Sequence, residues 1–280
     1  MAGALGRTLR FIRFSHTIFA MPFALGAMLV AARGLPPWRL VGWVALAMAL
    51  ARTAAMCFNR VADWEIDQRN PRTADRHTLI SRGGAIALLV ASAAAFVATT
   101  WFINRLCFLL APVALAIVFF YSLTKRFTSF SHFVLGLALS VSPVGAWLAV
   151  RGRFEWPPLV LALAVLLWVA GFDMIYATMD EAFDRAAGLH SWPVKRGAEG
   201  ALRWAIGLHV AMFGVLAGFG WLAGLRAGFC ASLLAVAGAL FYEHRVARRR
   251  DIGAVNRAFF NANAVVGVAF VLGVALDVIA

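Results

Sequence analysis

The chain has 280 residues, of which 62% are hydrophobic and only 14% are charged, and its mean hydropathy is +0.81. So few charged side chains cannot cover the surface of an ordinary soluble domain, which excludes that class and indicates that the bilayer is the solvent of this protein. The net charge of +13 is compatible with nucleic-acid binding, but in a membrane protein a basic excess first reports topology.

Nine apolar stretches are each long enough to cross a membrane as a helix, which takes roughly 17 to 25 residues. In chain order they are residues 14–32, 40–58, 84–103, 106–123, 133–150, 157–176, 201–220, 227–242 and 258–280. The first follows three arginines, as a signal peptide does, but its apolar run is long and eight more follow, so we interpret it as a retained helix. The pattern predicts an all-α integral membrane protein that forms a single domain over residues 1–280.

The lysines and arginines concentrate in the N-terminal tail and in the loops after the second, fourth, sixth and eighth stretches. By the positive-inside bias these segments face the cytoplasm. This predicts a multi-pass protein of a bacterial inner membrane with a cytoplasmic N-terminus and an outward-facing C-terminus. The basic excess is then a topology signal and a contact for anionic lipid, and we expect no nucleic-acid partner.

One arginine, Arg52, lies inside the second stretch, seven positions before Asn59 and on the same predicted helix face. A charge inside the bilayer is costly, which favours a functional residue, and Arg52 could bind the carboxylate of a substrate. The alternative is an arginine that extends its head group to the membrane surface or is paired for structural reasons.

Acidic residues gather in two short segments on the predicted cytoplasmic side. The first, NRVADWEID, follows the second stretch, and the other, DMIYATMDEAFD, begins in the sixth. Both segments carry polar residues every four positions: Asn59, Asp63 and Asp67 in the first, and Tyr176, Asp180 and Asp184 in the second. Residues four apart lie above one another on a helix, so each set is predicted to project from one face.

Asp173 lies seven residues before Asp180 and extends the second set. Stacked carboxylates repel one another unless a cation lies between them. Mg²⁺ takes carboxylate oxygens and keeps positions open for water and phosphate. A bland alternative is that these acids only solvate the helix ends, but two matched sets in a charge-poor chain favour a metal site.

Basic residues accompany both segments: Arg60, Arg69, Arg72 and Arg76 follow the first, and Arg185, Lys195 and Arg196 follow the second. Arginine binds phosphate oxygens through paired hydrogen bonds, and lysine acts as a point charge. Acids for metal beside bases for phosphate predict a Mg²⁺-diphosphate substrate. The sequence has no G-x-x-x-x-G-K-[ST] motif, which argues against nucleotide hydrolysis.

At these residues the chain resembles the UbiA superfamily of intramembrane prenyltransferases. The two segments match the family motifs N-[DR]-x-x-D-x-x-x-D and D-x-x-Y-A-x-x-D-x-x-x-D at every defining position, and NPRTADR and YSLTKRFT are similar to two further family segments. The resemblance covers essentially the whole chain. It implies nine transmembrane helices around a central cavity, with the two motif loops as a cytoplasmic cap.

The resemblance also implies a role for each site residue. Mg²⁺ would be held by Asn59, Asp63 and Asp67 on one side and by Asp173, Asp180 and Asp184 on the other. The diphosphate of a polyprenyl substrate would be bound by Arg72, Arg76, Lys125 and Arg126, although Lys125 and Arg126 could equally be membrane-surface anchors. Tyr121 and Tyr176 would steady the allylic cation, and catalysis would depend on Asp63, Asp67, Asp180 and Asp184.

Several segments are similar to one branch of the family, the 4-hydroxybenzoate polyprenyltransferase-like proteins associated with the futalosine route to menaquinone. These segments are AMCFNR, GLHS, YEHR and VNRAFFNANAVVG. The acceptor that this branch implies is 1,4-dihydroxy-6-naphthoate, and 4-hydroxybenzoate and other ring acceptors remain alternatives. The chain departs from the family after Arg76, where it reads RHTLISRG, and at Ser15, where relatives carry Glu before the residue that corresponds to His16.

A transporter of an anionic substrate is the rival interpretation from another class, since nine helices with polar residues could line a substrate path. Transporters usually place their binding groups near the bilayer midplane. Here both acidic sets lie at helix ends, which favours an active site at the membrane surface. A CDP-alcohol phosphotransferase is a further Mg²⁺-dependent alternative, but its D-G-x-x-A-R signature is missing.

Overall fold

The computed structural model describes residues 4–12, 19–249 and 251–280, and over these ranges every regular element is a helix. Eight helices are long and apolar enough to cross a membrane: α3 (Trp38–Ala62), α5 (Arg82–Trp101), α6 (Arg105–Thr124), α7 (Ser131–Arg151), α8 (Trp156–Ala177), α10 (Trp192–Leu222), α11 (Ala227–Ala247) and α12 (Ile252–Ile279). A shorter apolar helix, α2 (Met21–Ala32), corresponds to the second part of the first predicted span. The rest of that span, with Ser15 and His16, falls in residues 13–18, outside the described ranges. The prediction of an all-α membrane fold is confirmed.

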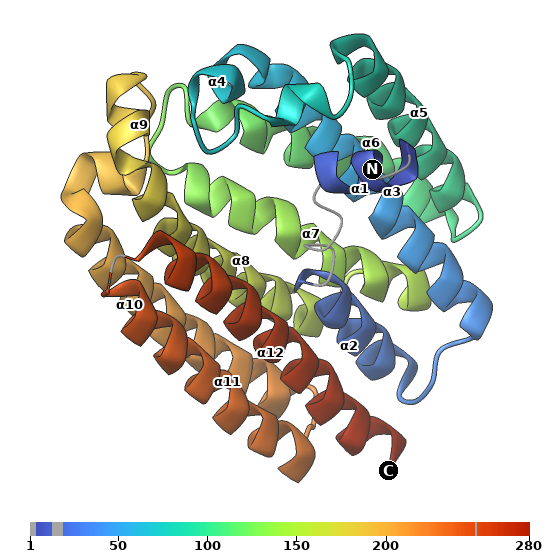
Figure 1. Cartoon of the computed structure of the whole chain (residues 1–280). Helices are drawn as coiled ribbons and strands as arrows, with labels where there is room; N and C mark the ends of the chain where they lie inside the picture. Colours follow the sequence, from blue (N-terminus) through green and yellow to red (C-terminus); the bar gives the residue numbers. More distant parts are fainter. Residues whose placement is uncertain (1–3, 13–18, 250) are drawn as a thin grey trace.

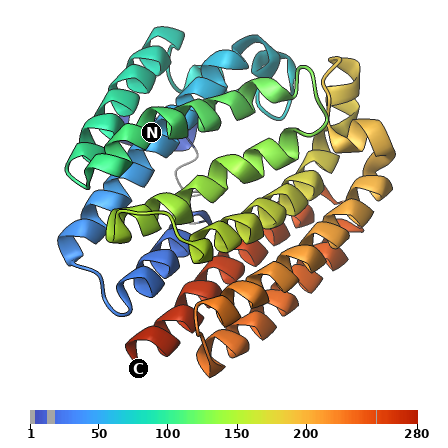
Figure 2. The same cartoon turned by 180° about the vertical axis from the view of Figure 1, so that it is seen from behind.

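The long helices run roughly side by side in one bundle (Figures 1 and 2). Helix α11 packs along α12, α10 along α8, α8 along α7, and α3 along α5, while α2 contacts both α7 and α12. Two short helices, α4 (Trp64–Arg69) and α9 (Glu181–Ala186), lie at one end of the bundle, opposite the C-terminus (Figure 1). We call this end the motif end, because both acidic segments lie there.

The core between α2, α8 and α12 is built from stacked aromatic rings. Phe23 lies 4.9 Å from Trp168 and 4.6 Å from Phe270, measured between ring centroids, and all three side chains are buried. Gly26 lets α12 approach, since a Cβ atom there would overlap the Phe270 ring. Close packing is the main force between helices in lipid, where the hydrophobic effect no longer holds them together.

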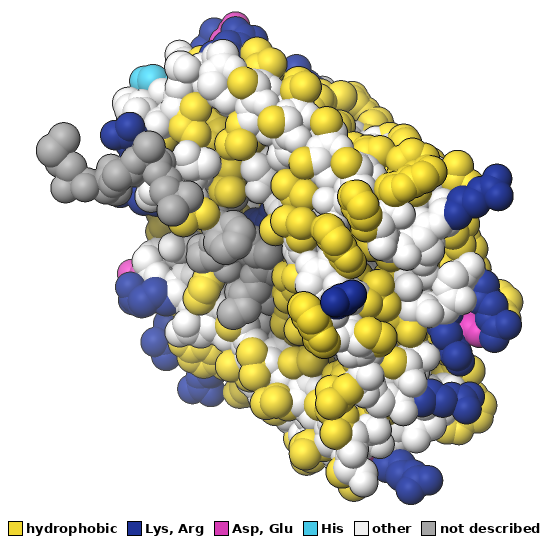
Figure 3. Space-filling model, turned by 90° about the vertical axis from the view of Figure 1, so that its right-hand side faces the viewer, with side chains coloured by type: hydrophobic (Ala, Val, Ile, Leu, Met, Phe, Trp, Pro, Cys, Tyr) yellow, Lys and Arg dark blue, Asp and Glu magenta, His cyan; other side chains and the backbone are white. Residues whose placement is uncertain are grey.

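The surface is consistent with a bilayer environment. In Figure 3 hydrophobic side chains cover much of the face, and most of the Lys and Arg side chains in view lie toward its edges. Tryptophans exposed near helix ends, Trp38, Trp156 and Trp221, suit the interfacial region, where an apolar ring with a polar N–H is favoured. The chain is therefore a multi-pass membrane protein.

The predicted spans lie within the observed helices to within a few residues, with two larger differences. Helix α10 begins at Trp192 rather than at residue 201, and Gly197 interrupts it with non-helical angles of φ 71° and ψ 165°. Helix α12 begins at Ile252 rather than at residue 258. Asp251 caps this start, since its side chain accepts a hydrogen bond from the backbone N–H of Ala254 at 2.5 Å. Hydropathy marks only the apolar part of a helix, so it misses polar turns that continue beyond the membrane.

The start of α11 is capped by a side chain from another helix. Asp277, near the end of α12, accepts hydrogen bonds from the backbone N–H groups of Arg226, Gly228 and Phe229 at 2.6, 2.8 and 2.9 Å. These are donors that an α-helix cannot satisfy internally at its first turn. The carboxylate therefore ties the two C-terminal helices together at the end opposite the motifs.

We expect Asp277→Ala to lower the free energy of unfolding by about 1–2 kcal/mol, because it leaves these donors unpaired. The measurement is the Tm of the purified protein in detergent. Asp277→Asn keeps an acceptor oxygen and should lose less. An unchanged Tm for Asp277→Ala would show that the cap does not stabilise the helix pair.

Candidate functional site

A cavity of about 700 Å³ opens at the motif end and continues between α3, α6 and α7. Every residue that the sequence assigned to the site lines this cavity: Arg52, Asn59, Asp63, Asp67, Arg72, Arg76, Tyr121, Lys125, Arg126, Asp173, Tyr176, Asp180 and Asp184. The fold thus brings together side chains from α3, α6 and α8 and from the loops that follow them. Segments more than a hundred residues apart in sequence share one wall.

The first acidic segment crosses a break between two helices. Helix α3 ends at Ala62, and Asp63 has φ −96° and ψ 17° before α4 begins. The backbone N–H of Asp63 still bonds to the carbonyl of Asn59 at 2.9 Å, and that of Asp67 bonds to the carbonyl of Asp63 at 2.7 Å. The four-residue spacing is therefore kept across the break, and the three side chains reach the same cavity.

The second acidic segment is interrupted in the same way. Helix α8 ends at Ala177, a short 3₁₀ helix, η3 (Thr178–Asp180), follows it, and α9 begins at Glu181. Asp180 and Asp184 are both buried, with exposed fractions of 8% and 3%. The prediction that each set of polar residues lies on one continuous helix is thus modified in both segments. The first segment crosses a break between α3 and α4, and the second passes from α8 into a 3₁₀ helix.

Arginines lie between the carboxylates of the first segment. Arg126 Nη2 lies 3.2 Å from Asp63 Oδ1. Asp67 is paired twice, with Arg60 Nη1 at 3.2 Å and with Arg76 Nη1 at 3.0 Å. Such pairs satisfy charges that would be costly to bury alone.

A second group of pairs joins the two segments. Arg72, which follows the first segment, donates from Nε to Asp180 Oδ1 at 2.8 Å and from Nη1 to the Tyr176 hydroxyl at 2.7 Å, and its Nη2 also reaches Asp180 Oδ2. Lys125 Nζ lies 3.5 Å from Asp184 Oδ2. Arg72 therefore links the first acidic segment to the second across the cavity mouth.

Each of these cations is paired with an acid that the sequence assigned to metal. In the described part of the chain, no three His, Cys, Asp or Glu side chains come close enough together to hold a metal ion. The donor chemistry nevertheless fits Mg²⁺, since carboxylate and amide oxygens of six residues line one cavity. Asp184 Oδ2 is buried, and Lys125 Nζ lies 3.5 Å from it as its ion-pair partner. The residues present therefore suit a hard divalent cation.

The electrostatic setting keeps the basic groups charged. Burial lowers the pKa of Lys125, but the carboxylates of Asp184 and its neighbours raise that pKa by more. Burial likewise lowers the pKa of Arg72, and Asp180 and Tyr176 raise it by more. Burial raises the pKa of Asp63 above its ordinary value, and the hydrogen bond from Arg126 offsets part of that shift.

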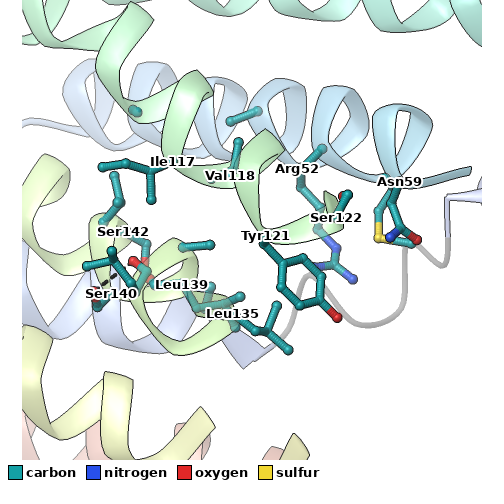
Figure 4. Close-up of a pocket in the computed structure, with 18 of the residues that line it drawn as sticks. Arg52, Asn59, Ile117, Val118, Tyr121, Ser122, Leu135, Leu139, Ser140 and Ser142 are labelled. Atoms are coloured by element: carbon teal, nitrogen blue, oxygen red, sulfur yellow. Dashed lines mark hydrogen bonds between the residues drawn. The ribbon is translucent and has the colours of Figure 1, made fainter. Parts of the chain in front are cut away.

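Below the charged mouth the cavity becomes apolar. Arg52 from α3 and Tyr121 from α6 point toward the same part of it, and Ile117, Val118, Leu135 and Leu139 continue its wall (Figure 4). The lining on α6 extends from Tyr121 to Cys107, which at 1.5 Å per residue is about 20 Å. The site therefore combines a charged mouth with a long apolar chamber.

Two residues of the site were given no role of their own from the sequence, although Arg60 was noted among the bases beside the first segment. Arg60, which is buried, donates from Nη1 to Asn59 Oδ1 and to Asp67 Oδ2, each at 3.2 Å. Its position seven residues before Asp67 is a signal that could have placed it on the same face. His132 lies 2.7 Å from Asp173, and no spacing in the sequence connects those two residues.

Several known proteins are similar to this chain. The family model of the UbiA prenyltransferase family matches residues 20–265. A protein of Vibrio cholerae named 4-hydroxybenzoate octaprenyltransferase is 32% identical over 261 residues, which is 91% of this chain and 90% of that protein. A protein of the same name from Enterobacter sp. is 35% identical over 257 residues, covering 90% and 88% of the two chains.

Solved structures show the same architecture. A UbiA homologue from Aeropyrum pernix K1 in its apo form is 33% identical, with a TM-score of 0.84 over 94% of this chain and 98% of that chain. A UbiA homologue from Archaeoglobus fulgidus bound to GPP and Mg²⁺ is 22% identical, with a TM-score of 0.73 over 96% and 99%. At that lower identity the likeness shows the fold.

We expect Arg60→Met to lower the free energy of unfolding by roughly 1.5–3 kcal/mol, because it removes the hydrogen bonds that this buried guanidinium donates to Asn59 and Asp67. The measurement is the Tm in detergent. Arg69→Met is the matched control, since Arg69 is exposed nearby on α4. Equal Tm values for the two variants would contradict a stabilising role for the Arg60 contacts.

Proposed function

This chain belongs to the UbiA prenyltransferase family, and from that premise we propose that it moves a polyprenyl group from its diphosphate to a ring carbon of a small aromatic acid in quinone biosynthesis. It is a membrane-embedded prenyltransferase, and the proposal concerns its substrates, its metal and its residues. The observation that carries it is the single cavity that joins both aspartate-rich segments, their cations and a long apolar chamber.

In the proposed site the charged mouth binds the diphosphate. Arg72, Arg76, Lys125 and Arg126 are the bases available to its oxygens, and all four line the mouth. The candidate ligands for Mg²⁺ are Asn59, Asp63, Asp67, Asp173, Asp180 and Asp184. Bound Mg²⁺ would neutralise charge on the leaving diphosphate. The GPP and Mg²⁺ in the Archaeoglobus fulgidus homologue support this assignment.

The reaction begins when the bond between the allylic carbon and the diphosphate oxygen breaks, and both electrons leave with the oxygen. The arginines and the lysine stabilise that charge as it develops, because they are already held at the mouth. The rings of Tyr121 and Tyr176 can face the allylic cation, and the apolar chamber keeps water from it. A ring carbon of the acceptor then forms the new bond and loses its proton, which restores aromaticity.

Arg52 is the proposed partner of the acceptor's carboxylate. It lies in the cavity about two helical turns below Asn59, next to Tyr121 (Figure 4). Both 1,4-dihydroxy-6-naphthoate and 4-hydroxybenzoate carry a carboxylate on an aromatic ring. The names of the Vibrio and Enterobacter relatives support 4-hydroxybenzoate, and the sequence segments noted above support the naphthoate.

The distribution of basic residues supports an orientation in a bacterial inner membrane with the N-terminus and the active site on the cytoplasmic side. At that surface the mouth meets soluble acceptor and Mg²⁺, while the chamber meets the isoprenoid tail from the bilayer. A substrate with one charged end and one long apolar end requires such an interface.

The direct test is to incubate purified protein in detergent with Mg²⁺, a radiolabelled long-chain polyprenyl diphosphate and each of the two acceptors in parallel. We expect label in a prenylated aromatic product with one of them. Diphosphate binding without product from either acceptor would shift the proposal to a different acceptor. Accumulation of intact substrate across vesicles, without product, would favour the transporter.

We expect Asp63→Asn and Asp180→Asn each to lower the transfer rate by ~10²-fold or more, because each removes a charge that binds the metal and so stabilises the leaving group. The rate is measured with the labelled substrate at saturating Mg²⁺. Asp75→Asn, an exposed position in the loop after the first segment, is the control and should retain activity. Undiminished turnover in the first two variants would remove the metal-site assignment.

We expect Arg52→Met to raise the KM for the carboxylate acceptor roughly 10–100-fold, since it removes charged hydrogen bonds at little change in volume. The methyl ester of the same acceptor lacks the charge, so its KM should be unaffected by the substitution. If the KM values of the acid and of its methyl ester rise equally, Arg52 stabilises the cavity wall and does not bind the carboxylate.

A further inference from the structure

His132 connects three separate elements beside the cavity. It is the second residue of α7, and its side chain is fully buried. Its Nδ1 lies 2.7 Å from Oδ2 of Asp173 on α8, and its Nε2 lies 3.1 Å from the backbone nitrogen of Trp192, the first residue of α10. The imidazole thus links the second acidic segment to the start of the next membrane helix.

The two contacts define which nitrogen carries the proton. A backbone N–H can only donate, so Nε2 must accept from Trp192. An imidazole that accepts at Nε2 is neutral, and its proton is on Nδ1. Nδ1 therefore donates to Asp173 Oδ2. The backbone of α10 in this way determines the direction of the hydrogen bond that reaches Asp173.

Asp173 differs from the other four carboxylates of the site. Asp63, Asp67, Asp180 and Asp184 each lie within 3.5 Å of an arginine or lysine. The partner of Asp173 is the neutral ring of His132. A neutral donor orients a carboxylate without cancelling its charge. Asp173 lines the cavity, and within the described ranges no hydrogen bond is formed to its other oxygen, Oδ1.

We propose that His132 is a positioning residue for the metal site: it holds Oδ2 of Asp173 so that Oδ1 and the full carboxylate charge are presented to a divalent cation in the cavity. This inference rests on the proposed function, because it requires a cation there. Hydrogen-bond partners behind ligating carboxylates commonly tune metal affinity 10–100-fold. The other carboxylates must exchange an arginine or lysine for the metal, whereas Asp173 needs no such exchange.

The test measures metal binding without turnover. Mn²⁺ replaces Mg²⁺, inorganic pyrophosphate is added, and free Mn²⁺ is followed by electron paramagnetic resonance with the purified protein in detergent. We expect His132→Ala to weaken Mn²⁺ binding about 10–100-fold. His132→Gln, whose amide can still donate to Asp173, should recover part of that loss. His77→Ala, at an exposed histidine in the loop after α4, is the matched control and should bind normally.

A double-mutant cycle tests whether His132 acts through Asp173. Asp173→Asn should weaken Mn²⁺ binding, and His132→Ala should then add little in that background. Additive losses would overturn the proposal, as would unchanged Mn²⁺ affinity in folded His132→Ala. If His132→Ala does not fold, His132→Gln replaces it in the same double-mutant cycle. Losses of Mn²⁺ affinity from His132→Gln and Asp173→Asn that add fully would then overturn the proposal.

Asp63→Asn separates this inference from the proposed function. If Asp63→Asn weakens Mn²⁺ binding and His132→Ala does not, the metal site stands and only the role of His132 is wrong. If neither substitution changes Mn²⁺ binding, the metal site itself is wrong, and the positioning role fails with it.

Discussion

The structure depends on mutual neutralisation of carboxylates and cations at one end of a membrane bundle. Five aspartates line the cavity near the apolar layer, where an isolated charge would be too costly to keep. Four of them are paired with arginine or lysine, and one with histidine. Because the partners come from two helices and from the loops after α4 and α6, these pairs also hold the loops over the cavity. Arg72 shows this most directly, since it joins the first segment to Asp180 and Tyr176.

The helix bundle below the motif end is apolar where the motif end is charged, and the position of the charged segments depends on how the bundle packs. The rings of Phe23, Trp168 and Phe270 pack against one another in an apolar core, so close packing makes the contact between α2, α8 and α12 there. That rigid packing presents the end of α8, with its acidic segment, toward the end of α3. The chamber between α3, α6 and α7 is left open, and its wall below Arg52 is mainly apolar, with Thr100, Ser140 and Ser142 as hydroxyl groups in the lining. A charged mouth on an apolar chamber follows from these two kinds of packing.

Much of this arrangement could be predicted from the sequence, because lipid allows few solutions. Long apolar runs must be helices, and the four-residue spacing of Asn59, Asp63 and Asp67 survives even where α3 gives way to α4. The break at Gly197 and the start of α10 at Trp192 could not be predicted, since a positive φ at one glycine leaves no hydropathy signal. Nor could the contact between His132 and Asp173, which exists only because α7 and α8 pack side by side.

In the proposed reaction, the carboxylate–cation pairs at the cavity mouth must separate when the substrate binds. In the proposed site, an arriving diphosphate would bring negative oxygens to Arg72, Lys125 and Arg126, and each bond from these bases to phosphate would weaken their pairing with a carboxylate. The carboxylates released in this way would need a new cation, and Mg²⁺ bound with the diphosphate would supply it. The bases would then pair with phosphate and the carboxylates with Mg²⁺, so that no charged group would be left unpaired. In the proposed reaction, binding of the two ligands is therefore cooperative, because each one removes the competitor of the other.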